Sequence, residues 1–329
     1  MAEVDAAGEF ETIRRLFAPL AHPEWGRGLT DDVAVVPSRP GHDLVLTKDA
    51  MVEGVHFLPN DPLDTVARKL LRVNLSDLAA KGAEPFGYLL ACHWSPRCGW
   101  PERMTFVDGL RADQKTFGVA LLGGDTVATL GPLSFSMTLL GWTPSGRTVG
   151  RAGARAGDLV FVTGAIGDGW LGLGAARGRL SLDLERIAAL CDHYRTPTPR
   201  TDFALPIRDM ANAAIDISDG LIADLGHLAE AGRVRIEIDL ETVPLSAAGQ
   251  AWFNDRVDEQ AALEKLVTGG DDYEIAFTAS ARDEAALRRE ADRRHLRLTR
   301  IGRVTAGQGV VARFGGQPVT FERAGFTHG

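Results

Sequence analysis

Two carboxylates flank a serine in the stretch from Asn212 to Gly226, NAAIDISDGLIADLG. Asp216, Ser218 and Asp219 follow a short apolar run that predicts a buried strand, and they precede apolar residues at helical spacing. Their side chains can converge at this strand-to-helix corner, where the helix N-terminus adds partial positive charge. Carboxylates so close together repel one another unless a cation or a proton lies between them. A plainer interpretation stays open, in which Ser218 or Asp219 is only the N-cap of the helix.

Further aspartates occupy similar positions elsewhere in the chain. Most lie where a predicted element ends or beside a Gly-rich turn, which is where sites are usually built. Taken singly, each is better explained as a turn or cap residue, although Asp77 is a poor filler for the apolar helix turn LSDLAAKGA. A cluster of oxygen ligands without histidine or cysteine favours Mg²⁺ over Zn²⁺, and Mg²⁺ usually completes its shell with phosphate oxygens. The residues are Asp31, Asp32, Asp49, Asp77 and Asp125.

The usual phosphate-binding loops are missing from the sequence. It contains no GxxxxGK[ST] and no kinase-type Gly-rich loop with a catalytic HRD. The run GAIGDG, Gly164 to Gly169, lies between a predicted strand and a predicted helix, but it lacks the GxGxxG order, and we interpret it as a βα turn. Metal ions and arginine side chains would therefore have to hold any phosphates.

These residues must be positioned by a chain of 329 residues, which is long for one hydrophobic core and predicts two domains. Both halves mix strands and helices without strict βαβ alternation, so the predicted fold class is α+β. The Gly- and Arg-rich run 146–158 lacks periodicity and marks the boundary. We predict domains at 1–148 and 149–329.

The elements around the aspartates of the first half follow from hydrophobic patterning. Apolar runs predict one strand at 33–36 and a second at 44–48, with Asp49 directly after it. A long helix is predicted from Asp61 to Gly82, with acidic residues at its start and glycine past its end.

Charge and cysteine content restrict the function. A net charge of −8 argues against a nucleic-acid-binding protein, but not against a nucleotide, because Mg²⁺ can bridge acidic groups and phosphates. Three cysteines and an acidic start without an apolar signal region predict reduced thiols and a cytoplasmic location. No apolar run approaches the roughly 18 residues that a membrane span needs, so we expect no membrane association.

Eight motifs along the chain together resemble thiamine-monophosphate kinase, within the aminoimidazole-ribonucleotide-synthetase-like superfamily. The similarity extends from GEF at Gly8 to GFTH near the C-terminus. The motifs are TDDVAVV, LTKDAMVEGVHF, NLSDLAAKGA, LLGGDT, GRTVGRAGARAGD, TPTPR, AIDISDGLIADLGH and TGGDDYEIAFT. Their combination and order are far more specific than any one of them.

The resemblance implies an ATP- and Mg²⁺-dependent transfer of the γ-phosphoryl group to thiamine monophosphate, which gives thiamine diphosphate and ADP. It also implies that the first domain, with a mixed sheet, pairs across a homodimer into a barrel-like sheet, and that the second domain closes a cleft that binds ATP. The attacking group is a phosphate oxygen that is already ionised at neutral pH. We therefore assign no general base.

The resemblance also implies roles for individual residues at the matched motif positions. The metal ligands would be Asp32, Thr47, Asp49, Asp77, Asp125, Asp216 and Asp219. The nucleotide contacts would be Asp32, Thr47, Lys48, Gly124, Asp125, Arg151 and Ser218. The residues near thiamine phosphate would be His56, Asp271 and Phe326. Without the motifs, His56 would be an ordinary half-buried histidine, Arg151 a solvated linker charge and Phe326 a tail residue packed on the core.

Three residues depart from the family pattern. Thr30 replaces a usual glycine of the first loop, which would alter the turn. Lys48 replaces a usual serine or threonine and either adds a phosphate contact or points to solvent. Asp271 replaces a usual glutamate and reaches less far. None of the three removes a metal carboxylate, so we expect activity to survive.

Two other classes of function stay open. Another ATP-dependent enzyme of the superfamily, aminoimidazole-ribonucleotide synthetase above all, would share the acidic site. A selenophosphate synthetase would need a reactive cysteine or selenocysteine before Cys92, and the hydrogenase-maturation relative would need a C-terminal one, where this chain ends in FTHG. The second class is a non-catalytic protein that binds thiamine phosphate or a nucleotide, in which Lys48 and Asp271 would be signs of a decayed active site. The intact set of carboxylates argues against this possibility.

Overall fold

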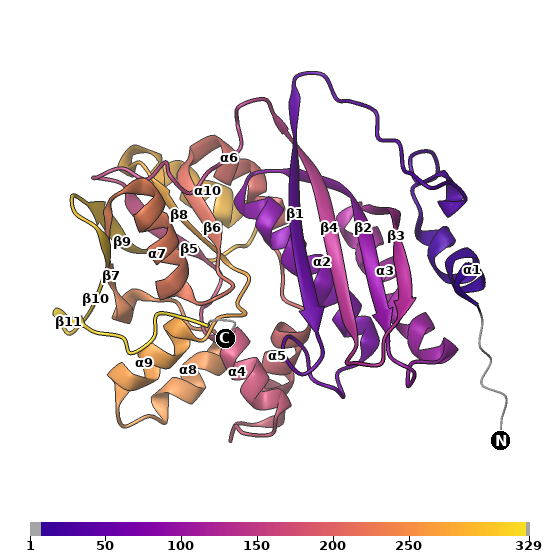
Figure 1. Cartoon of the computed structure of the whole chain (residues 1–329). Helices are drawn as coiled ribbons and strands as arrows, with labels where there is room; N and C mark the ends of the chain where they lie inside the picture. The colour runs from indigo at the N-terminus through magenta and orange to yellow at the C-terminus, as the bar shows by residue number, and fades with distance from the viewer. Residues whose placement is uncertain (1–7, 327–329) are drawn as a thin grey trace. The chain divides into compact units, whose positions relative to one another are not determined.

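The computed structural model describes residues 8–326, which form two compact units (Figure 1). Unit 1 contains the described residues up to Leu78 and then Glu84–Gly146. Unit 2 contains Ala79–Ala83 and the described residues from Arg147 onward. The last crossing between the units therefore lies within the Gly- and Arg-rich run, and the brief earlier crossing at 79–83 is a feature that the sequence did not indicate. The GEF motif begins at the first described residue, whereas the end of the GFTH motif lies outside the described residues.

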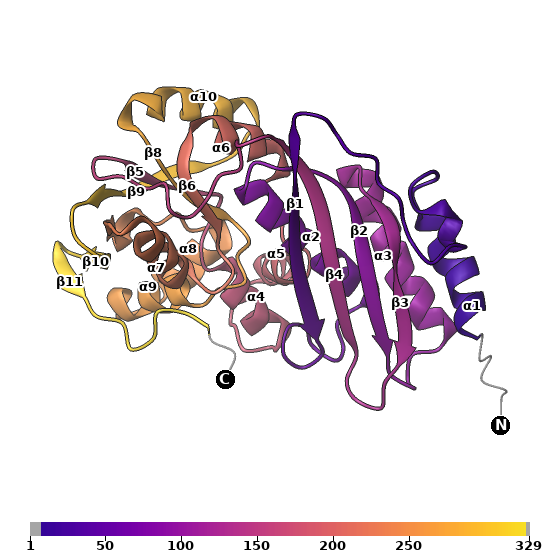
Figure 2. The ribbon, with the colours of Figure 1, turned by 45° about the horizontal axis from the view of Figure 1, so that its top comes forward.

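Unit 1 is built on a four-stranded mixed sheet in the order β1-β4-β2-β3. The strands are β1 (His42–Val52), β2 (Glu84–Trp94), β3 (Ala120–Ala128) and β4 (Ser134–Pro144). Strand β4 pairs antiparallel with β1 and β2, whereas β2 and β3 are parallel. Two helices, α2 (Leu63–Ala80) and α3 (Trp100–Phe117), lie along one face of this sheet (Figure 2).

The two faces of the unit 1 sheet differ because side chains alternate along each strand. Phe135, Met137 and Leu139 of β4 point to the helix side and are fully buried. The opposite face, which we call the open face, carries apolar side chains that are between 40 % and 57 % exposed. These are Leu44, Leu46, Leu89 and Val127.

Two local predictions for unit 1 were wrong. Residues 33–36 do not form a strand. Val33 and Val35 are exposed, and Val35 has one backbone hydrogen bond, from its N–H to the carbonyl of Trp25, instead of a neighbouring strand to pair with. Strand β1 does not end before Asp49, because its pairing with β4 continues to Val52. Asp49 therefore lies inside a strand, on a side-chain position set by the pleat.

The segment before β1 is helical but irregular. It contains α1 (Glu9–Thr12), a π-helical turn at Ile13–Phe17, and 3-10 turns at Ala18–Leu20 and Arg27–Leu29. Leu16, Phe17 and Leu20 are buried, whereas Phe10 at the start of this segment is 83 % exposed.

Unit 2 contains a seven-stranded mixed sheet in the order β11-β10-β7-β9-β5-β8-β6. Its strands are β5 (Leu159–Thr163), β6 (Ala211–Asp216), β7 (Arg235–Asp239), β8 (Ile275–Ala279), β9 (Leu298–Thr305), β10 (Gly309–Phe314) and β11 (Gln317–Val319). Its helices are α4 (Asp168–Ala176), α5 (Leu184–Arg195), α6 (Ala204–Met210), α7 (Leu221–Gly232), α8 (Ala247–Asn254), α9 (Glu259–Thr268) and α10 (Glu284–Arg293). Only the β7–β10 pair is parallel among the paired strands described.

Both faces of the unit 2 sheet are buried. Val160 and Val162 of β5 belong to one apolar cluster, together with residues of α4, α7, α8 and α9. Phe161 belongs to a second cluster, together with residues of α6 and α10. A strand buried on both faces needs a continuous apolar run, which is why LVFV reads so clearly in the sequence. The mixed α/β character predicted for both halves is confirmed.

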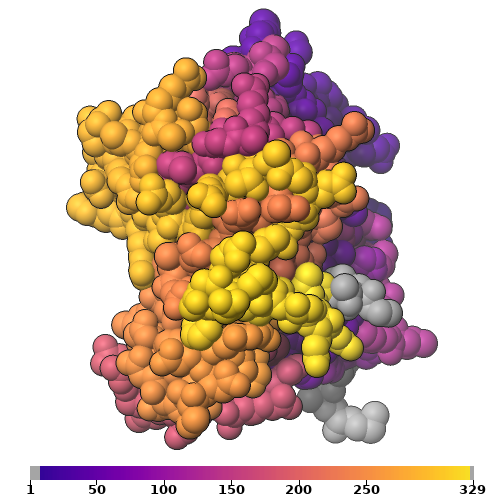
Figure 3. All heavy atoms as spheres, turned by 90° about the vertical axis from the view of Figure 1, so that its left-hand side faces the viewer, coloured from indigo at the N-terminus to yellow at the C-terminus, as the bar shows by residue number. Residues whose placement is uncertain are grey.

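Strand register brings three connecting loops of unit 2 to one edge of its sheet. Asp216, the last residue of β6, pairs with Ile275, the first of β8, and Val162 near the end of β5 pairs with Ala276. The loops that follow β5 and β6 and the loop that precedes β8 therefore meet. The C-terminal segment, coloured yellow, runs across the surface of unit 2 in Figure 3.

No helix of residues 8–326 has the length and apolar character of a membrane span.

Candidate active site

An acidic group lies between β1 and α2 in unit 1. Strand β1 places Thr47 and Asp49 on its helix-facing side, and α2 supplies Asp77. The Thr47 hydroxyl donates a hydrogen bond to the Asp77 carboxylate. Burial, and then the negative charge of Asp77, raise the pKa of Asp49 to about 7. No lysine or arginine of the described chain forms an ion pair with either carboxylate, so the group lacks a positive charge and suits a hard cation.

Lys48 lies apart from this group. It is exposed on the open face, because neighbouring residues of a strand point to opposite sides. Its Cα partner on β4 is Thr138. The lysine therefore does not neutralise Asp49 within its own unit.

A pocket of about 600 Å³ in unit 1 contains a second set of predicted residues. It is lined by the N-terminal helical segment, by Asp32 and its loop, and by Gly124 and Asp125 of β3. Gly124 allows β3 to approach β2 closely, because a Cβ atom there would lie 1.9 Å from the carbonyl oxygen of Leu90. Apolar walls and a few polar groups in such a volume are typical of a small-molecule site.

The acidic group and this pocket do not coincide in unit 1. Asp125 pairs with Ala91 on the open face, whereas Asp49 faces the helices. Strands β1 and β3 are also three inter-strand spacings apart, which is roughly 14 Å. One copy of unit 1 thus brings Asp49 to Asp77 and Asp32 to the pocket of Asp125, but it does not bring the two sets together.

The loop that carries Asp32 accommodates Thr30 without strain. Thr30 has φ −106°, which any residue adopts, and its hydroxyl donates to the carbonyl of Arg27 at 2.9 Å. The positive φ values fall earlier, at Arg27, Gly28 and Leu29. A glycine at position 30 is therefore not required by this turn.

The strand-to-helix corner of unit 2 carries Asp216, Ser218 and Asp219, as the sequence indicated. The N-cap of α7 is Gly220, with φ 122° and no side-chain cap, so the interpretation of Ser218 or Asp219 as an N-cap was wrong. A residue within the helix supplies the cap instead. One carboxylate oxygen of Asp224 accepts the backbone N–H groups of residues 218, 219 and 220 at 3.1 to 3.2 Å.

Asp224 and His227 extend this corner beyond the predicted residues. One ligand atom each from Asp219, Asp224 and His227 lies within 4.8 Å of the others, an arrangement that could hold a metal ion. Burial and the charge of Asp219 raise the pKa of Asp224 to about 7. The spacing of Asp224 and His227, three residues apart on a helix, puts both on one face and was a signal in the sequence.

The structure brings two of the predicted substrate residues to the same corner. The backbone N–H of Asp271 donates to the carbonyl of Ser218 at 2.8 Å, and that of Phe326 donates to the carbonyl of Asp219 at 2.9 Å. Asp271 has φ 67°, a left-handed conformation that the short aspartate side chain tolerates better than most. This conformation gives a local reason why aspartate is acceptable at position 271.

Two predicted residues, Arg151 and His56, belong neither to the acidic group of unit 1 nor to the strand-to-helix corner of unit 2. Arg151 is exposed and lies in the segment before β5, which contacts β6 where the Ala214 N–H donates to the carbonyl of Gly150. His56 belongs to unit 1, and its Nδ1 accepts the backbone N–H of Val52 at 3.0 Å. That hydrogen bond gives His56 a structural part in the turn after β1.

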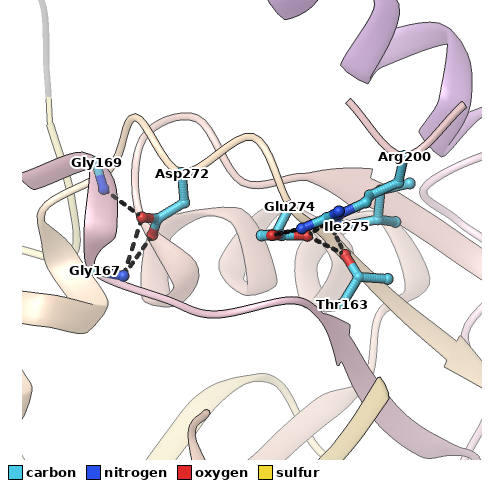
Figure 4. Close-up of polar contacts among 7 residues, drawn as sticks. All are labelled: Thr163, Gly167, Gly169, Arg200, Asp272, Glu274 and Ile275. Carbon is cyan, nitrogen blue, oxygen red and sulfur yellow. Dashed lines mark hydrogen bonds and ion pairs between the residues drawn. The ribbon is translucent and has the colours of Figure 1, made fainter. Parts of the chain in front are cut away.

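Two buried acids next to Asp271 were missed by the sequence analysis. Asp272 accepts hydrogen bonds from the backbone N–H groups of Gly167 and Gly169, and Glu274 pairs with Arg200 (Figure 4). Burial raises the pKa of Asp272 well above its ordinary value. The doubled aspartate in GGDDYE was a signal, but only Asp271 matched a family role. The interpretation of GAIGDG as a βα turn is confirmed, since it joins β5 to α4.

Comparison with known proteins gives consistent results over the whole chain. Residues 30–143 match the AIR synthase related protein N-terminal domain, and residues 155–315 match the C-terminal domain. A thiamine-monophosphate kinase of Caulobacter vibrioides is 47 % identical over 336 residues, which covers 100 % of this chain and 95 % of the relative.

Two solved structures are similar to this chain in both sequence and fold. The crystal structure of thiamine-monophosphate kinase from Stenotrophomonas maltophilia is 36 % identical, with a TM-score of 0.82 over 97 % of this chain and 98 % of that one. A structure described as AaThiL complexed with AMPPCP and TMP is 32 % identical, with a TM-score of 0.77 over 100 % of this chain and 99 % of that one.

Proposed function

The chain belongs to the thiamine-monophosphate kinases of the AIR synthase related family, and on this premise we propose that it phosphorylates thiamine monophosphate with ATP. The γ-phosphoryl group passes in line to the substrate phosphate and gives thiamine diphosphate and ADP. The observation that carries the proposal is the acidic group of unit 1, where Asp49 and Asp77 lie together without a positive partner in the described chain. The relative complexed with AMPPCP and TMP supports the two substrates.

The metal requirement is proposed to be several Mg²⁺ ions. The donors that would hold them are carboxylates and a hydroxyl, which are the hard oxygen ligands that Mg²⁺ prefers. The raised pKa of Asp49 fits this role, because a nearby cation would favour the ionised carboxylate. When bound, Mg²⁺ neutralises phosphate charge and aligns the reacting oxygens. The proposed ligands are Asp32, Thr47, Asp49, Asp77, Asp125, Asp216 and Asp219.

The protein side chains position the two anionic substrates. Phosphoryl transfer needs little covalent chemistry from the protein, and orientation and charge stabilisation supply most of the rate. Because the acceptor is already an ionised phosphate oxygen, no side chain has to remove a proton. The proposed nucleotide contacts are Asp32, Thr47, Lys48, Gly124, Asp125, Arg151 and Ser218, and the proposed thiamine phosphate contacts are His56, Asp271 and Phe326.

We further propose that two copies pair through the open face of unit 1 into a barrel-like sheet. The exposed Leu44, Leu46, Leu89 and Val127 support this, because several exposed apolar side chains on one face of a sheet are typical of an interaction surface. Asp125 lies on the same face, too far from Asp49 to share an ion with it in one copy. A second copy offers a way to complete the ligand set. Leu46→Lys should shift the sedimentation coefficient from dimer to monomer, and an unchanged dimer would contradict this interface.

A cytoplasmic location is proposed on the cysteines. Cys92, Cys98 and Cys191 form no disulfide in the described structure, which agrees with a reducing compartment.

The proposed reaction is tested by measuring ADP release from ATP and Mg²⁺, with and without thiamine monophosphate, while thiamine diphosphate is detected directly. Equal amounts of ADP and thiamine diphosphate are expected. Asp216→Asn should abolish turnover with the fold intact, whereas Asp255→Asn, an exposed control in unit 2, should not. ATP binding without stimulation by thiamine monophosphate would instead indicate another substrate of the superfamily or a binding-only protein.

A further inference from the structure

The segment from Gly270 to Tyr273 has an unusual backbone conformation. Gly270 has φ 71°, Asp271 φ 67° and Tyr273 φ 52°. A left-handed conformation costs a non-glycine residue roughly 1 to 2 kcal/mol, so two such residues persist only where the surroundings hold them. The residue between them, Asp272, is 1 % exposed.

Asp272 fastens this segment to the GAIGDG turn. Both of its carboxylate oxygens accept the Gly167 N–H at 3.0 Å, and one also accepts the Gly169 N–H at 2.9 Å. Figure 4 shows the carboxylate directed at the start of α4, with Glu274 held separately by Arg200 and Thr163. Asp272 and Glu274, two residues apart, are thus fixed to different parts of unit 2.

The GAIGDG turn is shaped to receive the segment. A Cβ atom on Gly169 would lie 2.3 Å from the carbonyl oxygen of Asp271. Gly169 is helical and does not need glycine for its own φ, so close approach to Asp271 is the reason for a glycine there. Gly167, in contrast, has φ 92° and is needed for the turn itself.

The other side of the segment joins the strand-to-helix corner. The N–H groups of Asp271 and Tyr273 donate to the carbonyls of Ser218 and Ile217, both at 2.8 Å. The segment therefore lies between the GAIGDG turn and the corner, and its backbone is fixed from both sides. Asp271 is half-buried.

We propose that Asp272 and the GAIGDG turn position Asp271 for thiamine phosphate. Asp272 is a positioning residue, which acts through the backbone of its neighbour and touches no substrate. This inference rests on the proposed function, which places Asp271 beside the substrate. The corner itself is held by Asp224, so loss of the Asp272 anchor should disturb the thiamine phosphate contact and leave the nucleotide contacts in place.

The test compares KM for thiamine monophosphate with KM for ATP in the full-length protein. Asp272→Ala should raise the first by about tenfold or more and change the second by less than about twofold. Asp272→Asn should have a smaller effect, because the single oxygen that accepts both glycine N–H groups is kept. Amide hydrogen exchange at Asp271 and Tyr273 should become faster in the alanine variant.

Gly169→Ala is a second variant that leaves Asp272 intact and displaces Asp271 directly. It should reproduce the rise in KM for thiamine monophosphate even if Asp272→Ala does not fold. Gly174→Ala is its control in the same helix, because the added Cβ meets only the flexible end of Leu180, at 3.3 Å.

Wild-type turnover with unchanged KM for thiamine monophosphate in Gly169→Ala and in folded Asp272 variants would overturn this inference and leave the proposed function standing. Equal rises in both KM values would also overturn it, because they would indicate a general structural role. A folded wild-type protein without turnover would overturn the proposed function, and the role of Asp272 with it.

Discussion

The described residues contain two pairs of acidic side chains, one buried and one half-buried, which differ in the partners that the protein supplies to them. Asp272 and Glu274 of unit 2, which we call the closed pair, are supplied with backbone N–H groups, a guanidinium and a hydroxyl. Asp49 and Asp77 of unit 1, which we call the open pair, have one side-chain hydroxyl donor between them, Thr47, which donates to Asp77. Neither member of the open pair forms an ion pair with a basic side chain of residues 8–326.

The comparison shows that burial alone does not mark a ligand site. Burial raises the pKa of Asp272 in the closed pair and of Asp49 in the open pair alike. What separates the pairs is the supply of donors and positive charge from the protein. An acid that the fold has already satisfied stabilises structure, whereas acids left without such partners need a ligand from outside.

The largest expected effect comes from breaking the open pair. Asp77→Asn should lower turnover by at least about 1,000-fold, about 4 kcal/mol, because a metal carboxylate is lost. Stability measured by urea unfolding should stay within about 1 kcal/mol, because no protein charge depends on Asp77. Asp108→Asn, at an exposed position of α3, is the control for steady-state assays. Retained turnover would remove Asp77 from the metal set.

Breaking the closed pair should lower the stability of the protein far more than breaking the open pair does. Glu274→Ala leaves the guanidinium of Arg200, whose side chain is only 20 % exposed, without its carboxylate. We expect a loss of about 3 kcal/mol in the free energy of unfolding. Glu284→Ala breaks more exposed pairs with Arg288 and Arg300 and should cost less than about 1 kcal/mol. Similar losses in urea unfolding for the two variants would contradict the difference between buried and exposed pairs.

The pH dependence of the free energy of unfolding, measured on metal-free protein, tests the open pair further. The pKa of Asp49 is about 7 in the folded chain, above its ordinary value of 3.8. The folded chain therefore binds more protons between these values, and the resulting stability is present near pH 4 and lost as the pH rises through 7. The loss should be about 2 to 4 kcal/mol.

Asp49→Asn is the matched variant for this titration, because other raised carboxyls remain in it. Thermal unfolding at several pH values should show a flatter profile for the variant than for the wild type. Mg²⁺ added at pH 8 should stabilise the wild type and have a smaller effect on the variant. Identical profiles for both proteins would show that Asp49 is not the titrating group.

The smallest expected effects come from two threonines, each of which donates a hydrogen bond from its hydroxyl to one acid of a pair. Thr163 is fully buried, donates to Glu274 and accepts the N–H of Ile275. Thr163→Val should cost about 1 to 2 kcal/mol, because it leaves buried groups unpaired. Thr47→Val, in the half-buried open pair, should cost about 0.5 kcal/mol or less and lower activity instead. Thermal unfolding and activity assays of both variants test this prediction. A larger loss of stability in Thr47→Val than in Thr163→Val would contradict it.

Much of the candidate site could be predicted from the sequence because its members sit at local signals. The break after AAIDI, the glycine after LLG and the apolar run of α2 place Asp216, Gly124 and Asp77 at identifiable points of elements. The anchors were harder to find. Asp224 and Asp272 bind backbone N–H groups of other segments, and a carboxylate that accepts from the backbone looks in the sequence like any other acid.

The sequence by itself determined most of the element types, the mixed α/β class and the family, because these follow from patterning and motifs along the chain. Only the tertiary structure decided which face each residue occupies. Asp49 faces the helices because it pairs with Met137 of β4, and Asp125 lies on the open face because it pairs with Ala91 of β2. The two strands between β1 and β3 keep the two carboxylates apart. Strand order and register depend on pairing between distant segments, and a single residue of register moves a side chain to the other face.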